Sequence, residues 1–125
     1  MNDAFLRLAL IIIAAVTVAS GATQMAAPAF VLGIVGGDAT PAAAHLFRTV
    51  GMFMLITGAM FLQTLLSQSE EAAVPLWIAV QKYAAAGLVG YAVFVGLFGP
   101  LALGVAGFDL LSAVLTTIFL VRLGR

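Results

Sequence analysis

Four long apolar runs dominate this sequence and restrict the chain to one kind of fold. Each run is about 20 residues long, the length that an α-helix needs to cross the hydrocarbon core of a bilayer. Because 64% of the 125 residues are hydrophobic and only 8% are charged, polar side chains are too few to cover a water-soluble domain. We therefore expect a single all-α domain over residues 1–125, a four-helix transmembrane bundle. The expected spans are residues 5–23, 43–66, 75–98 and 101–122.

The stretch between the first two runs, residues 24–42, is rich in glycine and proline. Its apolar part, APAFVLGIVGG, is too short to span a bilayer, so we expect a connection with a re-entrant or interfacial segment. The first run has a second interpretation. A short charged start, an apolar core and the small residues 19–22 also fit a secretory signal peptide, and this alternative stays open.

The placement of arginine predicts the orientation. With four spans, both termini and the polar loop at residues 67–74 lie on one side, which carries Arg7, Arg122 and Arg125, whereas the opposite side carries Arg48. Since positively charged residues are enriched in cytoplasmic loops, we expect both termini in the cytoplasm.

Three ionisable residues fall within the spans, where charge is costly: Arg48, Lys82 and Asp109. At a rise of 1.5 Å per residue, Arg48 and Asp109 differ in depth by roughly 4.5 Å, whereas Lys82 and Asp109 differ by roughly 9 Å. We therefore expect Arg48 and Asp109 to form the intramembrane pair. This pair either holds helices together or couples Asp109 to a proton or cation, with Arg48 as a switchable partner.

Other polar residues are candidates for a headgroup or ligand contact. We expect Lys82, beside Gln81 and one turn after Trp77, to extend toward cytoplasmic lipid headgroups; contact with an anionic lipid or a quinone is the alternative. His45 is the only histidine, and we expect it at the interface, hydrogen-bonded to the loop. A histidine that ligates a chlorophyll-type pigment is the other interpretation.

Small residues recur at spacings typical of helix packing. Ala86 and Gly90 lie one turn apart in the third run, and Gly51 and Gly58 lie two turns apart in the second. Such surfaces serve contacts inside a bundle and between subunits alike. We expect both, and hence a homo-oligomer or a larger membrane complex surrounded by membrane lipids.

The sequence lacks the residues that several classes of function require. A net charge of zero with no basic run argues against nucleic acid as a partner. With no cysteine, one histidine and scattered carboxylates, the chain has no recognisable metal motif, and we expect no metal and no cofactor. There is no G-x-S-x-G, so we expect no catalytic residues and no enzyme.

A resemblance to a known group of proteins rests on a few short stretches. These are HLFRTVGMFM at residues 45–54, followed by Gly58 and later by Gln81-Lys82 and Phe108-Asp109. Residues 40–122 resemble the small four-helix bacterial membrane proteins grouped as DoxX-like. The resemblance implies a four-helix fold in a bacterial cytoplasmic membrane. Members of that group share no established activity, although roles beside membrane oxidoreductases are suggested for some. Small multidrug-resistance transporters have a similar length, but they depend on a glutamate in the first span, and residues 5–23 contain no acid.

Three functions follow as hypotheses. The first is a non-catalytic accessory or structural subunit that packs against other membrane proteins. The second is a small oligomeric transporter or channel subunit that uses Asp109 and Arg48. The third is a membrane protein that binds a lipid, a quinone or a pigment.

Overall fold

The computed structural model describes residues 1–124, and that part of the chain folds into five α-helices without any strand. Four helices are long and apolar enough to cross a membrane, which confirms the expected all-α, four-span fold. They are α1 (Asp3–Ala26), α3 (Pro41–Leu66), α4 (Ala73–Phe94) and α5 (Ala102–Leu123). The fifth, α2 (Pro28–Ile34), occupies the Gly/Pro-rich stretch and is too short to span.

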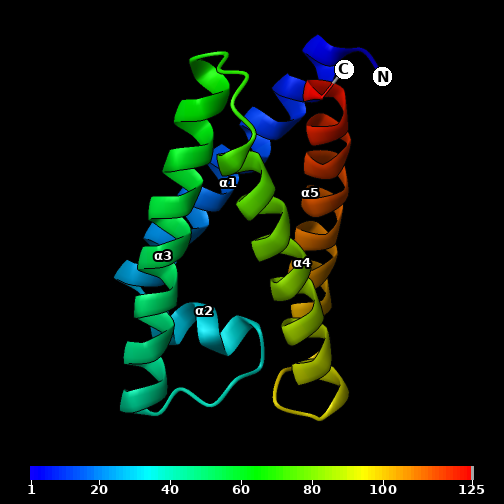
Figure 1. Cartoon of the computed structure of the whole chain (residues 1–125). Helices are drawn as coiled ribbons and strands as arrows, with labels where there is room; N and C mark the ends of the chain where they lie inside the picture. Colours follow the sequence, from blue (N-terminus) through cyan, green and yellow to red (C-terminus); the bar gives the residue numbers. More distant parts are fainter. Residues whose placement is uncertain (125) are drawn as a thin grey trace.

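The four long helices form two antiparallel pairs. α1 packs against α3, and α4 packs against α5, while α1 also contacts α5 and joins the pairs (Figure 1). Both termini and the α3–α4 connection lie at one end of the bundle, called here the terminal end. α2 and the α4–α5 connection lie at the opposite end, called the far end (Figure 1).

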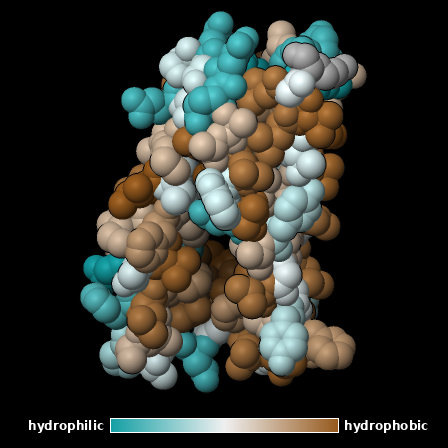
Figure 2. All heavy atoms as spheres, viewed as in Figure 1, coloured by the Kyte–Doolittle hydropathy of each residue, from teal (hydrophilic) through white to brown (hydrophobic). Residues whose placement is uncertain are grey.

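The outer surface is suited to lipid rather than to water. Large apolar side chains such as Phe94, Leu88 and Trp77 are exposed, and hydrophobic residues cover much of the face in Figure 2, while polar residues gather toward its two ends. Hydroxyl groups inside the helices donate to the carbonyl one turn earlier, as Thr57 does to Phe53 at 2.7 Å. Lipid offers no hydrogen-bond partner, so this internal bonding is what a membrane helix requires. The chain is an integral membrane protein.

The first two long helices begin at side-chain caps. Asn2 Oδ1 accepts the Phe5 N–H at 2.7 Å, and Thr40 Oγ1 accepts the Ala43 N–H at 3.2 Å. Each cap satisfies one of the backbone donors that a helix leaves free at its start.

α4 ends at Phe94 rather than at the expected Phe98, because a glycine terminates it. Gly96 has a φ of +83°, and its N–H donates to the Val93 carbonyl while the Leu97 N–H donates to the Ala92 carbonyl. This is a Schellman motif, which requires a left-handed residue after the helix. Residues 95–101 therefore form a longer connection than the expected turn at Gly99-Pro100.

The far end is closed by a contact between two loops. Gly36, which follows α2 with a φ of +79°, lies against Gly99 of the α4–α5 connection, and a Cβ at Gly36 would be 2.5 Å from the Gly99 nitrogen. The Gly99 N–H donates to the Val35 carbonyl at 2.8 Å. The short α2 segment is thus bonded to the α4–α5 pair.

Two apolar clusters fill the ends of the bundle and leave the middle less packed. The terminal cluster joins α1, α3, α4 and α5 through Leu6, Leu10, Ile13, Ala14, Phe61, Leu65, Ile78 and Phe119. The far cluster is built on Leu32, Val35 and Ala102, with Ala43, Phe47, Val89, Val93 and Phe98 packed around it.

A cavity with a polar end as the candidate functional site

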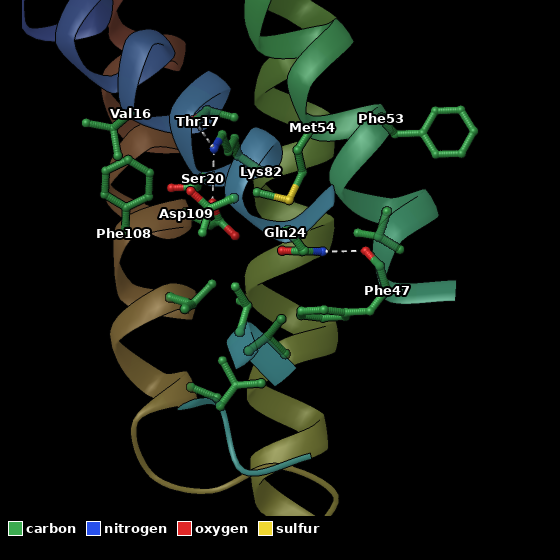
Figure 3. A pocket seen from close by; sticks show the side chains of 18 of the residues that line it. Val16, Thr17, Ser20, Gln24, Phe47, Phe53, Met54, Lys82, Phe108 and Asp109 are labelled. Carbon is green, nitrogen blue, oxygen red and sulfur yellow. Dashed lines mark hydrogen bonds and ion pairs between the residues drawn. The ribbon is translucent and has the colours of Figure 1, made fainter. Parts of the chain in front are cut away.

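A cavity of about 730 Å³ lies between the two clusters and is bordered by all five helices. Its wall is mainly apolar, and it opens as a hollow on the face between α3 and α4 (Figure 2). The apolar lining includes Val31, Val35, Phe47, Met54, Val89, Phe98, Ala102 and Phe108. Polar side chains border it at Thr17, Lys82 and Asp109, which are joined by hydrogen bonds from Lys82, and at Gln24 (Figure 3).

Lys82 is the centre of the polar end. Its side chain turns into the bundle, where the residue is only 6% exposed, and its Nζ donates to Asp109 Oδ1 at 3.1 Å and to Thr17 Oγ1 at 3.0 Å (Figure 3). The ammonium also lies 5.2 Å from the centre of the Phe108 ring, a cation–π distance. One side chain of α4 is thus bonded to α1 and α5.

Gln24 supplies the second polar group of the cavity. Its Nε2 donates to the Phe47 carbonyl at 2.9 Å, and because a carbonyl only accepts, the amide oxygen must point the other way. Gln24 is 5% exposed, and no buried side-chain oxygen or nitrogen within residues 1–124 lacks a partner. Its Oε1, which receives no hydrogen bond from those residues, therefore faces the open space of the cavity.

The same reasoning applies to Asp109. Its Oδ1 accepts from Lys82, while its Oδ2 receives no hydrogen bond from the part of the chain that the structure describes. Figure 3 shows the Asp109 carboxylate beside the Lys82 ammonium, and the Gln24 amide with its nitrogen toward Phe47; both residues border the cavity. The hydroxyl of Ser20, one turn before Gln24, also borders this space.

The expected pair of Arg48 and Asp109 is not formed, since Asp109 pairs with Lys82. Arg48 is exposed on α3 and is not part of the cavity wall. The reason is the arrangement of the helices around the bundle. Because α5 packs against α4 and α1 rather than against α3, Arg48 on α3 lies away from Asp109 even at a similar depth in the membrane.

The expected position of Lys82 at the headgroups is also corrected, because the side chain is buried in the bundle. Its neighbour Gln81 lines the cavity and donates to Thr57 Oγ1 at 3.3 Å, which links α4 to α3. Trp77 is 64% exposed and His45 is exposed, and neither borders the cavity.

The small residues fall into two groups. Gly51 and Gly58 lie where α3 crosses α1, and a Cβ at Gly51 would be 2.8 Å from the Gly21 carbonyl oxygen. In contrast, a Cβ at Gly90 would meet nothing within 4 Å, and Ala86 is half-buried. The surface near Gly90 therefore has no close neighbour within residues 1–124.

Thr17 and Gln24 were not among the site residues expected from the sequence. A signal was present, because Thr17, Ser20 and Gln24 follow one another at three- and four-residue spacings, but Gln24 was assigned to the connection 24–42, whereas α1 continues to Ala26. That spacing places polar groups on one helix face, which in a membrane must meet protein or a polar ligand rather than lipid tails.

No protein-family model, no curated protein and no solved structure matches the chain. Within residues 1–124, no group of three or more His, Cys, Asp or Glu side chains is placed to hold a metal ion. Fold and site together define the class: a four-span helical membrane bundle with a polar-ended cavity open to its side.

Proposed function

We propose that this protein binds a small lipid-soluble molecule, carrying one polar group, in the cavity between its helices. The cavity itself is the observation that carries the proposal. Its volume of about 730 Å³ lies within the range of small-molecule sites, and its apolar walls with a few convergent polar groups are the usual composition of such sites. Among the three hypotheses from the sequence, the ligand-binding one has this support.

The position of the opening supports a ligand that comes from the bilayer. The hollow lies on the side of the bundle between α3 and α4, beside exposed apolar residues such as Phe53. The two apolar clusters occupy the ends of the bundle. A transport path through Arg48 and Asp109 has less support, because Arg48 is not part of the cavity wall.

For the cellular location, we propose a bacterial cytoplasmic membrane with both termini in the cytoplasm. The charges at the terminal end support this orientation. Arg7 donates to the Leu65 carbonyl at 3.0 Å, and Arg122 pairs with Asp3 at 2.8 Å, so both guanidinium groups lie at that end. Arg48 lies on the far half of α3, and Arg125 lies outside the described residues.

The experiment is native mass spectrometry of the protein extracted from its own membrane in mild detergent. We expect a bound molecule of discrete mass, identified after solvent extraction. Ala85 lines the cavity, whereas its neighbour Ala84 is exposed on the outer surface and does not. We expect Ala85→Phe to fill the cavity and to remove most of the bound molecule, and Ala84→Phe to retain it.

Two results would contradict the proposal. One is a protein that carries no molecule other than ordinary bilayer phospholipid. The other is equal occupancy in the Ala85→Phe and Ala84→Phe variants, which would place the bound molecule outside the cavity.

A second candidate is the accessory subunit, and one observation favours it. Gly87 and Gly90 on α4 and Gly104 and Gly107 on α5 have no atoms near the position of a Cβ, so two helices expose small residues that permit close approach. The same spectra test this role. A partner protein at fixed stoichiometry, lost on Gly90→Leu, would support it, and a monomer in all preparations would contradict it.

A further inference from the structure

We infer that the polar group of the ligand is an uncharged hydroxyl, so that the site selects lipid-soluble alcohols. This inference rests on the proposed binding function and concerns the same cavity. It follows from the charge of the polar end and from the hydrogen-bonding groups that remain free there.

The first step concerns charge. Lys82 and Asp109 pair at 3.1 Å, with their side chains 8% and 13% exposed, so the polar end carries no net charge. An ionic ligand would add an uncompensated charge in a place of low dielectric, where such charge is strongly disfavoured. A neutral polar group meets no such penalty.

The second step concerns hydrogen bonds. The Lys82 ammonium already contacts Thr17, Asp109 and the ring of Phe108. One N–H of the Gln24 amide donates to the Phe47 carbonyl. The oxygens at the cavity that receive no hydrogen bond from residues 1–124 are the acceptors Asp109 Oδ2 and Gln24 Oε1, and the Ser20 hydroxyl beside them can donate or accept.

The third step matches these acceptors with a ligand. A ketone, an ester or an ether only accepts hydrogen bonds and cannot satisfy either oxygen. An alcohol donates its proton to Asp109 Oδ2, which as a charged acceptor forms the stronger bond, and its oxygen can accept from the Ser20 hydroxyl, which borders the same space. A hydroxyl is the smallest neutral group that meets both needs.

The test compares two molecules that share one apolar body, geranylgeraniol and geranylgeranyl methyl ether. Both are titrated into the delipidated protein in nanodiscs, and bound and free protein are counted by native mass spectrometry. Since hydrogen bonds to charged groups are the strong ones, we expect the alcohol to bind at least about tenfold more tightly than the ether.

A double variant, Lys82→Met with Asp109→Leu, is the matched control. It replaces the charge pair by apolar side chains of similar size, and its fold is checked by circular dichroism. We expect it to bind both molecules with affinities that differ by less than about threefold. Retention of the tenfold preference would overturn the inference, because the preference would then arise outside the charge pair.

The remaining outcomes separate the inference from the proposed function. Equal binding of alcohol and ether by the wild-type protein, abolished by Ala85→Phe, would overturn the hydroxyl selectivity and leave the cavity as a binding site. Binding of neither molecule, together with an empty protein from the native membrane, would overturn both.

Discussion

Lys82 contacts groups from two other helices, Thr17 on α1 and Asp109 and Phe108 on α5. In the middle of a membrane bundle, each charge of the pair is tolerable only while the other is present. Removing one partner leaves an uncompensated charge, whereas replacing both by apolar side chains removes the desolvation cost together with the attraction. A single substitution is therefore expected to lower stability more than the double substitution does.

We expect Lys82→Met alone to lower the free energy of unfolding by about 3 kcal/mol, because Asp109 loses the partner that offsets the cost of its burial. Lys82→Met with Asp109→Leu should return stability to within about 1 kcal/mol of the wild type or above it. Unfolding by sodium dodecyl sulfate, followed by circular dichroism, measures both. A double variant less stable than Lys82→Met alone would contradict the coupling of the pair.

The identity of this pair was the part of the site that depth alone could not predict. Hydropathy correctly indicated that Asp109 and Lys82 lie within spans, and the rise per residue placed Arg48 closer than Lys82 to the depth of Asp109. The depth of a residue in the membrane does not show which helices are neighbours. Lys82 and Asp109 belong to consecutive helices that pack together, and a long lysine side chain covers the remaining distance.

At the scale of helices, the α1–α3 contact depends on glycine. A Cβ at Gly21 would lie 2.7 Å from both the Gly51 carbonyl oxygen and the Leu55 nitrogen, which are backbone atoms and cannot turn aside. Gly51 approaches the α1 backbone in the same way from the other side, whereas a Cβ at Gly58 would first meet the side chains of Val18 and Thr17, at 3.1 and 3.2 Å. Backbone contact of this kind lets two membrane helices pack without a hydrophobic driving force between them.

We expect Gly21→Ala to destabilise the protein by about 1 to 3 kcal/mol, since the added methyl group forces the two helices apart. The control is Gly87→Ala on α4, where a Cβ meets nothing within 4 Å; helix propensity predicts no loss and a gain of up to about 1 kcal/mol. The midpoint of thermal unfolding in detergent compares the two. Equal midpoints would contradict the close contact at Gly21.

The four long helices could be predicted from the sequence, because apolar runs of spanning length have no other fold in lipid. The residues at which these helices end were harder to predict. The α4 terminus depends on Gly96 rather than on the more conspicuous Gly99-Pro100, and in a chain with 13 glycines the sequence does not indicate which one adopts a positive φ. Gly51 and Gly58 were marked as packing residues, but their partner, α1, emerged only from the arrangement of the helices.

At the scale of the whole molecule, the two ends of the bundle differ in charge. Arg7 and Arg122 lie at the terminal end with the acidic α3–α4 connection, and Arg48 lies in the far half. Because the chain contains no cysteine, a single introduced thiol reports its own side of the membrane without background.

We expect Glu70→Cys, in the α3–α4 connection, to react with a membrane-impermeant maleimide only after cells are permeabilised. Asp38→Cys, in the connection before α3, should react in intact cells. Both residues are exposed, so the two variants differ in side rather than in accessibility. Labelling of both thiols from one side would contradict the four-span topology, and a reversed pattern would contradict the proposed orientation alone.

The bond from the Gly99 N–H to the Val35 carbonyl has a mechanical consequence. It joins the two helix pairs at the far end of the bundle, while the terminal cluster joins them at the terminal end. The bundle is thus joined at both ends, whereas α3 and α4 contact each other little along its side. On the proposed function, a ligand would enter and leave through that side while both ends stay joined. Passage of the ligand to the far face of the membrane would instead require the bond between Gly99 and Val35 to break.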